Sequence, residues 1–314
     1  MAQRNDGLFF YLGVLILLVF PWLGLTYHLW GWVVDVSLLL SVFGVGYRLG
    51  WIAAAVLLAS GYAVAAGVFG FSGVETLSFT PVAGVFGLWI RRWLPGNVAF
   101  FWSVAVAAAL TVFPFLRGFP DMMNESLIRE NVDFMMQMYQ TTGLFATLQQ
   151  QGMTEIMIRQ RITDTLALYL QLTPALTAIA GMMTYGMAYY ILRRFYGGWN
   201  RAVPFVLWRF PKKTLWGVNA AIILFLIGEQ FSQPVLKLFG LNVMLVYAAV
   251  TLVLGMAVFT FFLKATQLPV LVKWGIIGFN IVLAPFSVMS IMLLGLLDLG
   301  LNFRRLPDQT SDKP

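Results

Sequence analysis

The sequence predicts an all-α fold: a polytopic bundle of eight to ten transmembrane helices with an amphipathic helical cap on its extracytoplasmic side. Hydrophobic residues make up 60% of the 314 residues and charged residues 11%, whereas an ordinary soluble domain has roughly 25% charged residues. Apolar runs recur along the chain, long enough to cross a bilayer core of about 30 Å as helices. A single long polar segment interrupts them. We therefore treat residues 1–314 as one integral membrane domain.

The spans follow from the apolar runs. In chain order we expect them at residues 8–27, 31–48, 51–71, 75–91, 97–116, 166–192, 214–233 and 238–263. We interpret the first run as a retained span, because it is too long for a signal peptide and no small-residue cleavage site follows it. The tract from 268 to 301 would be roughly 50 Å long as one helix. Because Pro285 divides it, we expect two short helices, 268–283 and 286–301.

The distribution of Lys and Arg orients these spans. When both termini are placed in the cytoplasm, most of the Lys and Arg residues fall in cytoplasmic connections and few fall outside. This is the positive-inside arrangement of membrane proteins. The basic loop 193–213 then faces the cytoplasm, where we expect contact with anionic lipid headgroups. We expect no nucleic-acid partner.

Residues 118–165 form the polar interruption, which this topology places outside. A helix is expected from near Glu125, because an apolar stripe at helical spacing follows it. The stripe consists of Leu127, Ile128, Val132, Met135, Met136 and Tyr139. A second helix is expected over 153–165, and its apolar contacts would be Ile156, Ile158 and Ile162. Gly143 and Gly152 are expected breaks. Together these helices would form a cap on the outer surface.

Small residues recur every four positions on the third span, at Ala55, Ala59, Ala63 and Gly67. This spacing places them on one helical face, where another helix can approach closely. Two interpretations remain open. The face packs within the same chain, or it docks a partner protein.

Two carboxylates, Asp35 and Glu229, are expected at similar depth near the outer face, together with the single histidine, His28. One interpretation is that they reach interfacial water, with a salt bridge from Glu229 to Lys237. The other is a polar pocket beneath the cap that binds a small molecule. Gln230, Asn242 and Tyr247 would join this pocket.

The chain is poor in catalytic and metal-binding residues. It has one histidine and no cysteine, and it contains neither a Walker loop nor a GxSxG motif. We therefore expect no enzyme activity, no cofactor and no metal site, and any ATPase that drives the protein would be another chain. Asp298 lies near the cytoplasmic end of the last span, where an ion pair with Arg304 or Arg305 is expected.

Four stretches carry a resemblance: LTPALTAIAG (172–181), ILRRFYG (191–197), LWRFPKKTLWG (207–217) and GLLDLGLNFRRL (295–306). Together they resemble the YybS-like family of bacterial inner-membrane proteins, whose function is unknown. That family is distantly similar to the substrate-binding S components of energy-coupling-factor (ECF) transporters and to the cell-shape protein MreD. The resemblance implies a location in the bacterial inner membrane and a helical core with a pocket open to the outside.

The resemblance also implies a small-residue face that docks on a transmembrane partner driven by paired ATPases. Ala55, Ala59 and Ala63 would stand for this docking face. It lies on the first helix of S components but on the third span here, and the extra spans and the cap also depart from that pattern. No vitamin-binding residue can be transferred.

The sequence is compatible with three functions. The first is a substrate-binding or translocating component of a small-molecule transporter, energised by a partner. The second is a scaffold that recruits cell-envelope or cell-shape machinery through the small-residue face. The third, least favoured, is a membrane enzyme that uses Glu229 as a general base.

Overall fold

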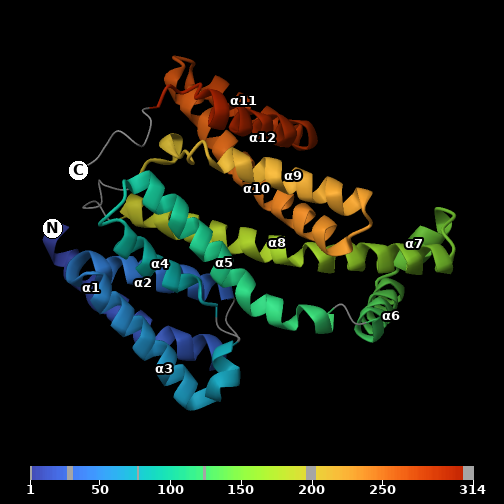
Figure 1. Ribbon diagram of the computed structural model, residues 1–314, viewed down its shortest axis with the longest axis horizontal. Helices are drawn as coiled ribbons and strands as arrows, with labels where there is room; N and C mark the ends of the chain where they lie inside the picture. Colours follow the sequence, from blue (N-terminus) through green and yellow to red (C-terminus); the bar gives the residue numbers. More distant parts are fainter. Residues whose placement is uncertain (1, 27–30, 76–77, 123–124, 196–202, 307–314) are drawn as a thin grey trace.

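The structure is a computed structural model that describes residues 2–26, 31–75, 78–122, 125–195 and 203–306. Within these residues the chain is helical throughout, apart from short connections, and it contains no strand (Figure 1). The elements are α1 (Ala2–Thr26), α2 (Gly31–Leu49), α3 (Trp51–Glu75), α4 (Thr80–Ile90), α5 (Gly96–Met122), α6 (Glu125–Thr141), α7 (Leu144–Gln150), α8 (Glu155–Phe195), the 3-10 helix η1 (Phe205–Leu207), α9 (Thr214–Gln230), α10 (Pro234–Ala265), α11 (Val270–Val282) and α12 (Ala284–Leu301). The all-α prediction is confirmed for this part of the chain.

The predicted spans coincide with helices. Within the part of the chain that the structure describes, six helices are long and apolar enough to cross a membrane, and four shorter ones are also apolar. Each of these helices coincides with one of the ten apolar runs expected from the sequence. The chain is therefore a multi-pass membrane protein, and the number of crossings remains a prediction. The hairpin is confirmed, because the chain breaks at Leu283 and Pro285 lies in the first turn of α12, where its missing amide proton costs nothing.

Helix α8 is the central element. It packs against α2, α4 and α5 on one side and against α10 on the other, so it lies between the α1–α5 part and the α9–α12 part (Figure 1). The main core gathers around its buried Tyr185 and Leu192, with Phe43 from α2, Phe100 from α5 and Leu254 from α10. The 41 residues of α8 would be about 60 Å long, roughly twice the bilayer core. One end of α8 must therefore project from the membrane.

The projecting end carries the predicted cap. Val132 and Met136 of α6 form a small core with Ile158 and Ile162 of α8. The breaks at Gly143 and Gly152 are confirmed, because both glycines adopt positive φ angles, of 74° and 85°. The contacts of Ile158 and Ile162 are confirmed as well. The contact expected of Ile156 is wrong, since this side chain is 80% exposed; it lies two residues before Ile158 and so on the opposite face of the helix.

The cap does not lie over the α2–α4 part of the bundle. Helix α6 packs against α8 and α7, with no comparable packing against α2, α3 or α4. Helices α6 and α7 lie at one end of the molecule, whereas α1 begins and α12 ends at the other (Figure 1). Among the described residues, the cap is therefore fixed to the extension of α8 and forms no pocket with Asp35 beneath it. Which end faces the cytoplasm remains a prediction.

Candidate functional site

Asp35 lies inside the helical bundle. It is in the second turn of α2, which packs against α1, α3, α4 and α8, and it is only 9% exposed. Its carboxyl group lies close to the side chain of Ser78, just before α4. A carboxylate within a membrane span is costly unless it has polar partners. The structure supplies such partners from neighbouring elements.

Hydroxyl groups extend from Asp35 across the bundle. The Tyr62 hydroxyl of α3 donates to the Ser78 carbonyl over 2.8 Å. The Ser78 Oγ lies 2.6 Å from the Thr80 Oγ1 and accepts a hydrogen bond from the Thr80 backbone N–H. The fully buried Thr80 in turn lies 2.9 Å from the Thr111 Oγ1 of α5. We call Asp35, Tyr62, Ser78, Thr80 and Thr111 the hydroxyl cluster.

Helix α8 closes the cluster from the other side. A β-carbon added at Gly181 would collide with the Thr111 hydroxyl and the Ala107 carbonyl. Only glycine therefore allows α8 to approach α5 so closely at this level. The hydroxyl cluster is thus enclosed by α2, α3, α4, α5 and α8.

Three of these hydroxyl groups form a series through the bundle. The Ser78 hydroxyl contacts that of Thr80, and the Thr80 hydroxyl contacts that of Thr111. The series ends where the Thr111 hydroxyl donates to the Ala107 carbonyl of its own helix over 2.7 Å. Asp35 lies beside the Ser78 end.

Glu229 lies elsewhere. It is near the end of α9, which packs against α10, and it forms an ion pair with Lys237 in which both side chains are about half exposed. The expected salt bridge is confirmed. The neighbouring Gln230 is also exposed. The structure does not bring this pair together with Asp35, because α9 and α2 lie on opposite sides of α8 (Figure 1).

Asn242 of α10 bonds to the backbone of α8. Its Oδ1 accepts from the Ala175 N–H, and its Nδ2 donates to the Gln171 carbonyl, each over 2.9 Å. Its Nδ2 also donates to the Leu238 carbonyl of its own helix. These contacts use both ends of the carboxamide. In this structure Asn242 therefore joins two helices next to Pro174.

Tyr247 is separate from Glu229 as well. Its ring and hydroxyl lie directly over Gly217, where a β-carbon would collide with them. Gly217 and Glu229 are twelve residues apart on α9, which is about 18 Å along a helix. The five residues predicted to bind substrate thus do not form one site: Glu229 and Gln230 lie together at the end of α9, Asn242 and Tyr247 lie elsewhere, and Asp35 alone belongs to the hydroxyl cluster.

The small-residue stripe of α3 faces away from the rest of the described chain. Ala59, Ala63 and Gly67 are exposed and Ala55 is partly buried. The neighbouring stripe makes the contacts within the chain, through the buried side chains of Ala54, Leu58 and Ala65 and through Gly61, which lies against the Leu17 carbonyl of α1. Packing within the chain is therefore wrong as an interpretation of the Ala55 stripe. Docking of a partner remains a prediction.

The expected ion pair of Asp298 is confirmed, with Arg304 as its partner. The Arg304 Nη2 lies 2.8 Å from Asp298 Oδ2, and both side chains are almost completely buried. Arg304 also donates to the carbonyls of Val206 and Trp208, over 2.6 and 2.9 Å. Two of the stretches that carry the family resemblance, 207–217 and 295–306, thus meet here. This cluster fixes the chain after α12 against the loop before α9.

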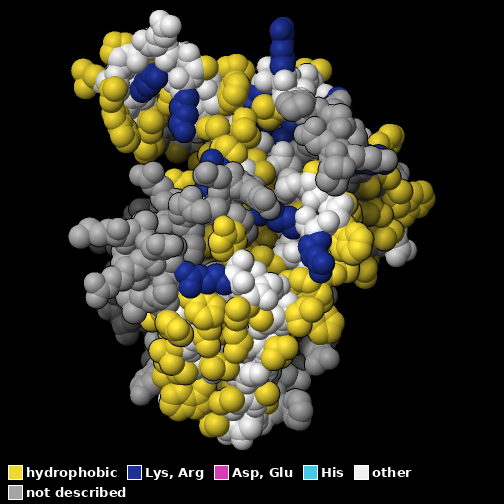
Figure 2. All heavy atoms as spheres, turned by 90° about the vertical axis from the view of Figure 1, so that its left-hand side faces the viewer, with side chains coloured by type: hydrophobic (Ala, Val, Ile, Leu, Met, Phe, Trp, Pro, Cys, Tyr) yellow, Lys and Arg dark blue, Asp and Glu magenta, His cyan; other side chains and the backbone are white. Residues whose placement is uncertain are grey.

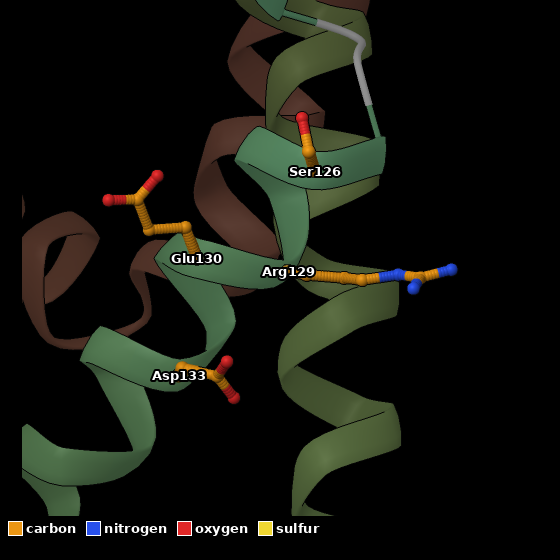
Figure 3. Close-up of a pocket in the computed structure, with 4 residues that line it drawn as sticks. All are labelled: Ser126, Arg129, Glu130 and Asp133. Atoms are coloured by element: carbon orange, nitrogen blue, oxygen red, sulfur yellow. The ribbon is translucent and has the colours of Figure 1, made fainter.

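An open depression on α6 offers no enclosed site. Ser126, Arg129, Glu130 and Asp133 line it, all from one helix, and Figure 3 shows Arg129 and Glu130 projecting in opposite directions. Asp133 forms an exposed ion pair with Arg159 of α8 over 2.6 Å. Among the residues that the structure describes, no group of three or more His, Asp or Glu side chains is placed to hold a metal ion. His28 lies outside the described residues.

Four members of the hydroxyl cluster, Tyr62, Ser78, Thr80 and Thr111, were not expected from the sequence. The stretch SFTP (78–81) contains two of them, but Ser and Thr in membrane helices commonly bond to their own backbone. Only the tertiary structure shows that these hydroxyl groups face one carboxyl. No signal in a single sequence distinguishes them.

Comparison with known proteins agrees with the membrane fold. A family model described as "Predicted membrane protein (DUF2232)" matches residues 8–299. Neither the curated proteins nor the solved structures give a match. Because the family model covers nearly the whole chain, this protein belongs to the DUF2232 family of predicted membrane proteins.

Proposed function

We propose that the protein is a non-catalytic, substrate-binding or translocating component of a small-molecule transporter, energised by a partner. The observation that carries this proposal is the enclosed hydroxyl cluster around Asp35, within a membrane span. Ionisable residues inside membrane spans commonly mark paths of ions, protons or substrates, because their cost must be offset by a role or a partner. The resemblance to the S components of ECF transporters supports the same class.

The chemistry of the cluster restricts the ligand. One carboxyl and four hydroxyl groups suit a proton, a cation or a small solute rich in hydrogen-bond donors. They do not suit a large apolar molecule.

The route to the cluster differs from the one expected beneath the cap. Because α6 and α7 are attached to α8, access to Asp35 would lie along the ends of α2, α3 and α4. The segments at these ends include residues outside those that the structure describes. Glu229, Gln230, Asn242 and Tyr247 are not needed for this binding site.

A second function is favoured by the outward stripe of α3. A scaffold would need no ligand at Asp35 and would use Ala55, Ala59, Ala63 and Gly67 to hold a partner helix. In the transporter the same stripe would hold the energising partner. Binding at Asp35 therefore distinguishes the two proposals, whereas docking at α3 does not.

The test compares two isosteric substitutions in the full chain. Asp35→Asn removes the carboxyl of the cluster, and Glu229→Gln is the matched control at an exposed carboxylate. Small molecules retained after purification in mild detergent would be identified by untargeted mass spectrometry. We expect a molecule that is enriched with the wild type and with Glu229→Gln but lost with Asp35→Asn. Equal retention by all three proteins, or no enrichment with the wild type, would contradict a ligand site at Asp35.

A further inference from the structure

An apolar groove lies between α8 and α10, away from the hydroxyl cluster. It has a volume of about 670 Å³, within the range of pockets that hold small ligands, roughly 300–1,000 Å³. Almost all of its lining is apolar, including Met183 and Tyr190 of α8, Val253 and Met256 of α10, and Trp208 after η1. Met183, Tyr190 and Met256 are 64%, 53% and 45% exposed, so the groove is open on the side of the lipid.

The length of the groove matches one leaflet. Its lining on α8 runs from Ile179 to Tyr190, which is about 16 Å of helix. That is close to half of a bilayer core of about 30 Å. An acyl chain from one leaflet has this length, whereas a partner helix that crossed the membrane would contact α8 over the full thickness.

The groove ends among cations. On α8 the lining residues Ile179, Met183, Gly186 and Tyr190 share one face, and Arg193 is the next residue on that face by helical spacing. Lys264 follows Met256 by eight residues on α10, about 12 Å further toward the same end. The exposed Lys212 and Lys213 follow the aromatic segment that closes the groove.

The surface at this end is basic. Figure 2 shows the end of the molecule where α1 begins, and its coloured side chains include Lys and Arg but no Asp or Glu. Trp208, whose indole N–H donates to the Val203 carbonyl, lines the same end of the groove. Amphipathic aromatic rings are typical of the headgroup level of a membrane.

We infer that the groove binds one acyl chain of an anionic phospholipid, whose headgroup lies among Arg193, Lys212, Lys213 and Lys264. The apolar lining excludes water from the chain, and the cations attract the phosphate. This site is independent of ligand binding at Asp35. The bound phospholipid would be a structural lipid at the junction between the two halves of the bundle.

Native mass spectrometry of the full chain in mild detergent tests the site. Phosphatidylglycerol and phosphatidylcholine with identical acyl chains would be titrated into the protein separately and in competition. Met183→Trp fills the groove, and Leu176→Trp is its control, on the same helix but outside the lining. We expect preferential retention of phosphatidylglycerol, a loss of bound lipid with Met183→Trp and no loss with Leu176→Trp.

A second pair of variants tests the headgroup. Lys213→Gln combined with Lys264→Gln should lower the preference for phosphatidylglycerol roughly fivefold for each charge removed, the usual contribution of one basic residue near anionic lipid. Arg92→Gln, at an exposed cation that does not line the groove, should leave the preference unchanged. Equal binding of both lipids, or lipid binding unaffected by Met183→Trp, would overturn the inference. Loss of a co-purifying protein with Met183→Trp, without loss of lipid, would overturn it too.

Discussion

The side chain of Asn242 on α10 forms hydrogen bonds with the backbone of α8 beside Pro174. In an α-helix the Ala175 N–H is paired with the Gln171 carbonyl, and here both of these groups bond to the Asn242 side chain. Proline within a helix clashes with the preceding turn and opens this ladder. In lipid the opened groups need partners from neighbouring helices. Asn242 is therefore a structural residue at the contact between α8 and α10.

This geometry predicts that Asn242→Leu destabilises the protein. The substitution keeps the approximate volume but leaves the Ala175 N–H and the Gln171 carbonyl without their partner, and we expect a loss of about 1–2 kcal/mol. Thermal unfolding of the full chain in detergent would measure it. Asn280→Leu is the control, because the Asn280 side chain donates to the Ile276 carbonyl of its own helix and the substitution leaves the backbone carbonyl of residue 280 in place. Equal stability of the two variants would show that Asn242 does not support α8.

The Asp298–Arg304 pair predicts a larger effect. Removing one partner of a buried ion pair leaves an uncompensated charge, so Asp298→Ala should cost about 3–5 kcal/mol. The chain offers a matched control in Arg305→Ala, because Arg305 is exposed and should change stability by less than about 0.5 kcal/mol. The same thermal measurement applies. A small loss with Asp298→Ala would mean that the cluster does not hold the loop before α9.

The helices could be predicted because each depends on local sequence alone. Apolar runs, Pro285, Gly143 and Gly152 determine where helices begin and end. The ion pair of Asp298 was also local, since its partner lies six residues away. In contrast, the relative positions of Asp35 and Glu229 depend on contacts between helices that are distant in the sequence. The Lys and Arg asymmetry gives the orientation of the spans across the membrane, but it does not indicate which helices are neighbours in the plane of the membrane.

The two stripes of α3 illustrate the same limit. Ala54 and Ala55 are adjacent, so the stripes that they begin are about 100° apart on the helix, and both contain small residues. Helical spacing therefore could not decide which stripe packs inside. The structure shows that Ala54, Leu58 and Gly61 pack against α1. Which stripe is buried depends on where α1 crosses α3.

The outward stripe predicts that Ala59→Leu weakens association with a partner without unfolding the chain. Ala59 is exposed, so added volume meets no other part of the described chain. In contrast, Gly61→Leu would collide with the Leu17 backbone and should lower stability. Co-purification and thermal unfolding, measured for both variants, separate the two effects. Unchanged partner recovery with Ala59→Leu would remove the docking proposal.

The positive-inside asymmetry predicts which end of the molecule meets the cytoplasm. The chain has no cysteine, so single cysteines can report accessibility to a membrane-impermeant maleimide. Gln140, near the end of α6, and Lys213, before α9, are both exposed. Helix α6 and the start of α9 lie toward opposite ends of the molecule (Figure 1). Gln140→Cys should react in intact cells, whereas Lys213→Cys should react only after the membrane is permeabilised.

The reverse labelling pattern would invert the topology. It would place the basic end and its lipid groove in the outer leaflet, against the charge bias that orients short loops. Labelling of both cysteines in intact cells would instead show that the chain does not separate two compartments. The reverse pattern would also change which side of the membrane supplies the ligand proposed for Asp35, because the hydroxyl cluster is fixed within the same bundle as both reporters.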